Sequence, residues 1–328
     1  MKRITAGLFL LSTVLFAAGI SIGDQPIAFN QLVSLLLSPE NVPPHIQLIV
    51  FDLRMPRLLL SILVGAALAV AGAITQAIMR NPLAEPGILG INAGAALAAM
   101  VLIVGVDGAS ESLLPWAGFL GACAMAAFVY ILSWRNGTTS LRIILIGIGL
   151  STLASAGSTL LSTFGAITEV QRAFIWLAGS VYHADWSNVR ILASWLVIPL
   201  ALTLISSRQL DVMRCGDPVA HGLGVRVNLA RAVLIVLCTL ISGAAVATAG
   251  LIGFVGLLAP HIARHLVGPL HKHVLPTSAL IGASLVMAAD LAGKTLIAPV
   301  ELPAGVVTAL IGAPFFGFLL WRQRHVPA

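Results

Sequence analysis

The sequence predicts an all-α polytopic membrane protein in which ten transmembrane helices form two inverted repeats within one domain, residues 1–328. Three observations predict this fold class. The chain is 59% hydrophobic and 9% charged, whereas soluble domains carry about 25% charged residues. Its apolar residues gather in long runs separated by short polar stretches. Short sequence patterns in two runs of the first half of the chain recur in two runs of the second half.

The first apolar run, Ile4–Ile22, directly follows Lys2 and Arg3. A basic start before an apolar run is also typical of a secretory signal peptide. This run is long enough to cross a bilayer, so we interpret it as an uncleaved first span. Residues 23–53 are polar and contain prolines, which predicts a loop before the second span.

Nine further apolar runs predict nine further spans. They lie at about 58–79, 88–106, 114–134, 142–163, 189–207, 231–250, 253–268, 274–293 and 304–321. The run at 253–268 is the least regular, because Pro260, His261 and Arg264 interrupt it.

Lys and Arg are distributed unevenly between the two sides of such a chain. With a cytosolic amino terminus and alternating spans, thirteen lie inside and five outside, which together make the 18 of the chain. The outer residues are Arg54, Arg57, Arg172, Arg190 and Lys294. This bias obeys the positive-inside rule and places both termini in the cytosol. The net charge of +6 therefore follows from membrane topology and does not indicate a nucleic-acid partner.

The repeats are visible as two pairs of echoed patterns. Gly65–Gly72 in span 2 reads GAALAVAG, and Gly243–Gly250 in span 7 reads GAAVATAG. Spans 4 and 9 share a Leu-Pro pair followed at equal spacing by a Gly-Ala pair: Leu114-Pro115 with Gly121-Ala122, and Leu275-Pro276 with Gly282-Ala283. Repeat one then covers about 57–163, repeat two about 231–321, and span 6 at 189–207 lies between them. Equivalent spans are an odd number apart, so the copies are inverted, as is typical of transporters.

The longest cytosolic interruption, Leu210–Arg231, joins the two repeats. It is too charged for hydrocarbon, yet it has an apolar face. Asp217 and Pro218 predict a helix start, with Asp as the N-cap, and Gly222 and Gly224 predict its end. A short amphipathic helix pair here would offer a docking surface for a soluble protein. An ordinary structured loop is the alternative.

Two turns at opposite ends of span 2 carry further polar groups. Arg54 and Arg57 stand at its outer mouth, where they either bind carboxylates of a soluble partner or snorkel at the interface. At its inner end, the prolines and glycines of Asn81–Gly90 predict a rigid turn. Asn81 and Leu83 either line a pore end or serve only this turn.

The sequence gives little support for a nucleotide site, a metal site or ion-coupled transport. The pattern at 288–295 is similar to a phosphate-binding loop, but it lies at the outer end of a span and lacks the preceding strand, so Lys294 is better interpreted as a third outer cation. His261 and His265 lack the Glu of a zinc-protease motif. Asp290 is the one acid within a predicted span, which is thin support for an ion-coupled carrier. The cysteines, Cys123, Cys215 and Cys238, form no spaced cluster. The residues therefore indicate a transport pore that is not an enzyme, with neither a cofactor nor a metal site.

Several motifs together resemble those of FecCD-type permease subunits of type II ABC importers, which carry iron–siderophore complexes, haem and cobalamin. The similarity runs from Arg54 to about Trp321. The motifs are Arg54-x-Pro-Arg57, Arg80-Asn-Pro-Leu-Ala, Ile88-Leu-Gly90, Trp176-Leu-Ala-Gly179, Leu223-Gly-Val225, Gly253-Phe-Val-Gly256, Pro260-His261, Ala289-Asp-Leu291, Glu301-Leu-Pro303 and Ile311-Gly-Ala-Pro314.

The resemblance implies an inner-membrane pore built with a second permease, two cytosolic ATPases that use the ATP, and a periplasmic binding protein. It implies that the segment between spans 6 and 7 docks on the ATPase; the residues concerned are Gly216, Asp217, Ala220, Leu223, Gly224 and Val225. The outer cations Arg54, Arg57 and Lys294 would receive acids of the binding protein. The family usually has Arg at the third position, so Lys294 would grip a carboxylate less specifically. The cytosolic gate would comprise Asn81, Leu83, Thr139 and Ser140.

The expected function is import of an iron(III)–siderophore, because most members of the family carry one. Haem or cobalamin is the alternative cargo within the family. An ion-coupled secondary transporter is the alternative of another class.

Overall fold

A computed structural model describes residues 2–23, 25–37, 40, 42–106 and 108–323. Over these residues the chain is helical and contains no strand. The carboxyl-terminal residues 324–328, which include Arg324 of the positive-inside count, lie outside these ranges.

Each of the ten predicted apolar runs forms a helix. These helices are α1 (Lys2–Ser21), α4 (Met55–Met79), α5 (Ile91–Gly105), α6 (Leu114–Leu132), α7 (Ser140–Phe164), α9 (Trp186–Ile205), α12 (Val227–Ala249), α13 (Val255–Val267), α14 (His271–Thr295) and α15 (Ala304–Gln323). Eight helical stretches are long and apolar enough to cross a membrane. The two shorter helices are α5, with 15 residues, and α13, with 13. Each begins after a residue with positive φ, Gly90 or Phe254, which turns the chain sharply just before the helix.

The prediction of a loop at 23–53 is wrong. This stretch contains α2 (Phe29–Leu37) and α3 (Pro44–Leu48), and a π-helical turn η2 (Ile49–Arg54) joins α3 to α4 without a break. Pro44 occupies the first turn of α3, where its missing N–H costs nothing. Apolar residues among the polar ones supply a small separate core around Ile46 and Val50.

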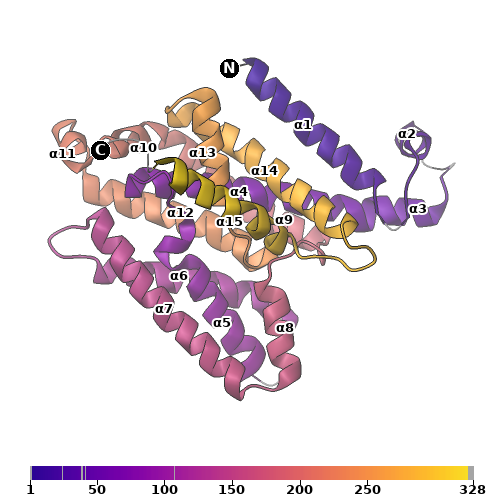
Figure 1. The fold of residues 1–328 in the computed structure, drawn as a ribbon, viewed down its shortest axis with the longest axis horizontal. Coiled ribbons are helices and arrows are strands. Elements are labelled where there is room, and N and C mark those ends of the chain that lie inside the picture. The colour runs from indigo at the N-terminus through magenta and orange to yellow at the C-terminus, as the bar shows by residue number, and fades with distance from the viewer. Residues whose placement is uncertain (1, 24, 38–39, 41, 107, 324–328) are drawn as a thin grey trace.

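The sequence also gave no indication of α8 (Ile167–Leu177), a short amphipathic helix between α7 and α9. Two further short helices, α10 (Ser207–Arg214) and α11 (Asp217–Gly222), occupy the segment between α9 and α12. In Figure 1, α10 and α11 lie at the left end of the molecule, while α2 and α3 lie at the right end.

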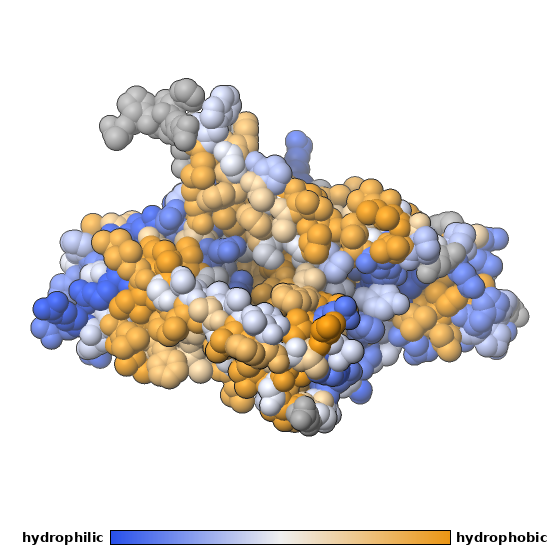
Figure 2. Space-filling view, turned by 60° about the horizontal axis from the view of Figure 1, so that its bottom comes forward, coloured by the Kyte–Doolittle hydropathy of each residue, from blue (hydrophilic) through white to orange (hydrophobic). Residues whose placement is uncertain are grey.

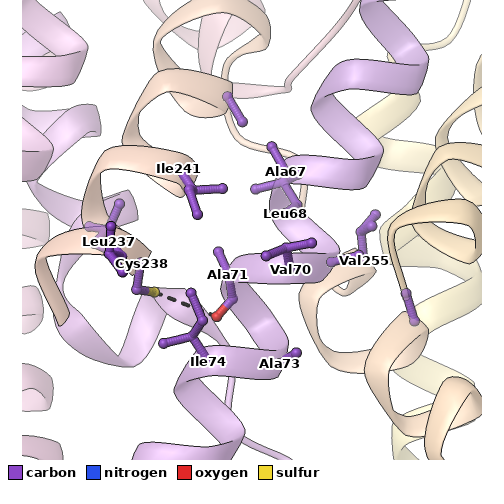
Figure 3. Close-up of a cluster of buried hydrophobic side chains, with 14 of the residues drawn as sticks. Ala67, Leu68, Val70, Ala71, Ala73, Ile74, Leu237, Cys238, Ile241 and Val255 are labelled. Atoms are coloured by element: carbon purple, nitrogen blue, oxygen red, sulfur yellow. Dashed lines mark hydrogen bonds between the residues drawn. The ribbon is translucent and has the colours of Figure 1, made fainter. Parts of the chain in front are cut away.

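The centre of the fold consists of α4, α12 and α14. Of the most apolar 18 residues in each helix, 78% are buried in the stretch that ends with α4, 72% in α12 and 67% in α14. The corresponding share in α1 is 6%. Figure 3 shows how α4 and α12 pack together: the Ala67–Ile74 face of α4 meets Leu237 and Ile241 of α12. Glycine makes the closest crossings possible. A Cβ atom on Gly65 would lie 2.2 Å from the carbonyl oxygen of Gly282 on α14.

Polar and apolar residues are segregated along the molecule. Figure 2 shows hydrophobic residues over much of the middle of one face and hydrophilic residues gathered at its left and right ends. This pattern is typical of a bundle whose middle contacts lipid and whose two ends contact water.

Candidate functional site

The segment that joins the two halves contains the helix pair that the sequence predicted. Leu210 and Met213 of α10 are fully buried and anchor it to the bundle. The N-cap assignment, however, is wrong. The N-cap of α11 is Gly216, whose φ of 102° suits glycine, and no side chain caps this helix. Asp217 is the first helical residue, and its carboxylate is bound to another helix.

The six predicted coupling residues differ in exposure, and Asp217 and Val225 are intermediate. Gly216 and Ala220 are buried, so they seat α11 on the bundle and offer no side chain to a partner. Leu223 is 65% exposed, and Gly224 has open space around it. The half-buried Val225 packs against the main core. The exposed members of the set therefore lie just after α11, in the turn that follows it.

α10 is tied to the amino-terminal end of α14. Asp211 accepts a hydrogen bond from the backbone N–H of His271 at 2.8 Å, and its carboxylate lies 2.6 Å from His271 Nδ1. Arg214 donates to the carbonyl oxygen of Pro269 at 2.9 Å. These contacts join α10 to the start of α14 and to the turn that precedes it.

Arg231 connects α11 to the loop before α7. Its side chain is fully buried, although it is an arginine. The Nη2 atom lies 2.6 Å from Asp217 Oδ1, and Nη1 donates to the carbonyl and hydroxyl oxygens of Thr138. A buried guanidinium persists only when it is well paired, so this contact fixes α11 relative to residue 138.

The four predicted gate residues occupy two adjoining turns next to this contact. Ser140 donates from its hydroxyl to the carbonyl oxygen of Ile78 at 2.8 Å, which joins the start of α7 to the end of α4. Thr139 is the N-cap of α7. Asn81 accepts a hydrogen bond from the backbone N–H of Leu83 at 2.9 Å. The contacts therefore run from α11 through Arg231 to Thr138, and from Ser140 to the end of α4, which the Asn81 turn follows along the chain.

Glu85, in the turn between α4 and α5, is a polar residue of this region that the sequence did not indicate. Burial raises the pKa of its carboxyl group, and a hydrogen bond with the backbone of Phe254 partly offsets that rise. Phe254 belongs to the second half of the chain, so Glu85 joins the turn between α4 and α5 to the N-cap residue of α13.

At the opposite end of α4, Arg57 is already paired within the chain. Its Nη2 atom lies 2.8 Å from Asp290 and 2.9 Å from Glu301, and its Nε donates to Asp290 as well. The guanidinium also lies over the ring of Tyr182, 5.2 Å from its centre. This arrangement explains Asp290, which is buried as the partner of Arg57.

The other two predicted docking cations bind carbonyl oxygens in the last turn of α1 and just after it. Arg54 donates to Ile20 and, at 2.6 Å, to Gln25, and Lys294 donates to Gly19 at 3.0 Å. The structure thus brings Arg54, Arg57 and Lys294 to one end of the bundle. Each of them is engaged with oxygens of this chain.

A cavity of about 880 Å³ opens at the same end, between α6, α8, α9 and α12. Aromatic residues line it, including Trp116 and Trp195, whose ring centres are 5.0 Å apart. Arg172 of α8 closes one side through an ion pair with Glu111 at 2.8 Å. No group of three or more potential metal ligands occurs in the described part of the chain.

Comparison with known proteins gives a consistent result. Residues 10–322 match the FecCD transport family. The chain is 41% identical to the achromobactin transport system permease protein CbrC of Dickeya dadantii, over 98% of this chain and 92% of that one. It is 37% identical to the hemin transport system permease protein HmuU of Yersinia pestis, over 98% and 97%.

A solved structure of a metal-chelate type ABC transporter in an inward-facing conformation matches with a TM-score of 0.88 at 31% identity, over 98% of this chain and 100% of that one. The fold and the sequence therefore lead to the same assignment, which confirms the resemblance seen in the motifs. The chain belongs to the FecCD transport family and is a permease subunit of an ABC importer.

Proposed function

We propose that this chain and a second permease subunit form an inner-membrane pore that carries an iron(III)–siderophore complex into the cytosol. Two cytosolic ATPases drive the pore, and a periplasmic binding protein delivers the cargo. The observation that carries the proposal is the path from α11 through Arg231 to the turn at Thr138–Ser140, and from Ser140 to Ile78 at the end of α4. A pore without its own nucleotide site can use the energy of ATP only through contact with an ATPase subunit, and this path would carry the resulting movement to the pore.

The packing supports ten spans in two inverted repeats. If α4 to α7 correspond to α12 to α15, each helix contact should have a counterpart. The contact of α4 with α14 has its counterpart in the contact of α12 with α6. The contact of α4 with α13 corresponds to that of α12 with α5. The contact of α5 with α6 corresponds to that of α13 with α14.

Residues of the repeated sequence patterns also contact one another where α4 crosses α14 and where α12 crosses α6. Gly65 faces Gly282 and Ala283, and its counterpart Gly243 faces Ala122. Within this arrangement the shorter helices α5 and α13 are equivalent spans, one in each repeat.

The siderophore is proposed as cargo from the names of relatives. They include permease proteins for achromobactin and for iron(3+)-hydroxamate, the second from Bacillus subtilis. Relatives named for hemin and cobalamin keep those cargoes as alternatives. An ion-coupled carrier is not favoured, because Asp290 is held by Arg57 and the matched family consists of ABC permeases. Uptake of ferric hydroxamate, ferric citrate and haem by reconstituted vesicles would identify the cargo.

We expect Leu223→Glu to prevent the ATPase from binding. Leu223 makes no buried contact that the subunit needs, so the fold should persist while a charge enters the docking surface. Burial of one leucine contributes about 1.5–3 kcal/mol, so co-purification of the ATPase should fall roughly tenfold or more. The matched control is Leu113→Glu, an apolar residue of 50% exposure that precedes α6 at the opposite end. Equal ATPase retention by both variants would exclude α11 as the docking site.

We expect the gate turns to move when ATP binds. Cysteines placed at residues 83 and 139, after Cys123, Cys215 and Cys238 are replaced by serine, should label at different rates in the ATP-bound and nucleotide-free importer. The exposed Arg135→Cys serves as the control, because it lies outside both turns and its φ is not positive. Rates that change equally at residues 83, 139 and 135, or nowhere, would contradict a gate at these turns.

A further inference from the structure

His261 and His265 of α13 form a pair that the transport path does not use. They lie one helical turn apart, and their Nε2 atoms are 3.2 Å apart. The ring planes make an angle of 66°, so the rings do not stack. His265 is exposed and His261 is half-buried, which leaves both nitrogens within reach of a molecule from solvent.

The separation of the two nitrogens is the one that a shared metal ion requires. A metal holds each imidazole nitrogen at about 2.0–2.1 Å, so two ligands at an angle of about 90–109° lie about 2.8–3.4 Å apart. The observed 3.2 Å falls inside this interval. Because α13 fixes both residues, little side-chain freedom is lost when a metal binds. The alternative explanation of this distance is a hydrogen bond between the two imidazole rings.

The surroundings define what kind of metal species fits. No third His, Cys, Asp or Glu completes a metal-binding group in the described chain, so the metal must bring its remaining ligands with it. Arg264 lies between the two histidines in the sequence, and its terminal nitrogens are buried without a hydrogen-bond partner among the described residues. Its charge opposes a bare cation and favours a metal whose other ligands are anionic.

We propose that His261 and His265 bind a divalent first-row transition metal that is already partly chelated by an anionic ligand and has two adjacent coordination positions free. Imidazole is a preferred ligand of Ni²⁺, Cu²⁺ and Zn²⁺. The site lies at the end of the bundle that carries α10, because Arg214 binds the carbonyl oxygen of Pro269 just after α13. It does not depend on the proposed transport function, since binding is measured on the isolated chain.

The probe is Ni²⁺–nitrilotriacetate, an anionic complex that leaves two adjacent positions open. The full chain, purified in detergent with a tag free of histidine, is titrated by calorimetry. We expect one complex per chain, and His265→Ala should weaken binding by at least about tenfold. His265→Gln should weaken it equally, because glutamine can replace a hydrogen-bond partner of His261 but not an imidazole ligand. His221→Ala, an exposed histidine of α11, should leave binding unchanged.

Two results would overturn the proposal. One is an absence of stoichiometric binding by the folded wild-type chain, which would leave a hydrogen bond as the only function of the pair. The other is an affinity that His265→Gln retains or that His221→Ala lowers to the same extent. Arg264→Gln tests the charge assignment, because it should weaken binding of the anionic complex more than binding of Ni²⁺ alone. Equal effects on both would contradict a role for Arg264.

Discussion

Replacing Arg231 with methionine is expected to abolish transport while the ATPase still binds. The guanidinium joins α11 to residue 138, through Asp217 on one side and Thr138 on the other. Methionine fills much of the buried volume but leaves both partners unsatisfied. Loss of one member of a buried ion pair costs about 3–5 kcal/mol. Asp217 is 30% exposed, so the lower end of that range applies.

Two milder variants separate coupling from folding. Arg231→Lys keeps the charge but cannot bridge both partners, because a lysine lacks the planar fork of an arginine. Asp217→Asn keeps the shape of the side chain and removes its charge. In both we expect ATP hydrolysis to continue with uptake reduced roughly tenfold or more, which corresponds to the loss of about 1.4 kcal/mol of coupling.

Arg226→Met is the matched control, since Arg226 is an exposed arginine five positions before Arg231. It should retain uptake in reconstituted vesicles. Wild-type uptake in Arg231→Lys and Asp217→Asn would show that force reaches the gate by another route. In that case the contacts of α10 with His271 and Pro269 would be the next candidates.

The sequence predicted what depends on local patterns. Apolar runs of sufficient length identified every helix of the two repeats, because hydrocarbon leaves the backbone few alternatives to a helix. The same reasoning missed α8, which is only 11 residues long and interrupted by Glu169 and Arg172. It also missed α3, where a pair of prolines suggested a loop although proline is well suited to a first helical turn.

Pairing across the chain could not be predicted from the sequence. Arg57 is separated from its partners Asp290 and Glu301 by 233 and 244 positions, so its spacing carries no information about them. The same limit applies to Ala220. A small residue on a short helix suits either a partner's surface or the subunit's own core, and only the packing shows that it is buried.

Replacing Arg57 with methionine is expected to destabilise the subunit itself. Asp290 is 3% exposed and would remain as a buried carboxylate without its cation. This loss costs about 3–5 kcal/mol and should lower the midpoint of thermal unfolding in detergent by several degrees or more. Arg54→Met should have a smaller effect, since Arg54 binds carbonyl oxygens that water can satisfy at the partly exposed end of α1.

A double variant tests whether the pair or the arginine alone is responsible. Arg57→Met combined with Asp290→Leu removes both buried charges and should recover part of the lost stability, because hydrophobic residues can replace a buried ion pair at little cost. Lys294→Glu and Lys294→Met then test docking separately, because both lose the hydrogen bond to the carbonyl oxygen of Gly19 and only the first reverses the charge. Lys294→Glu should lower the affinity for the binding protein more than Lys294→Met does. If Arg57→Met unfolds near the wild-type temperature, the pair with Asp290 contributes little to the fold, and Arg57 is free to bind a carboxylate of a partner.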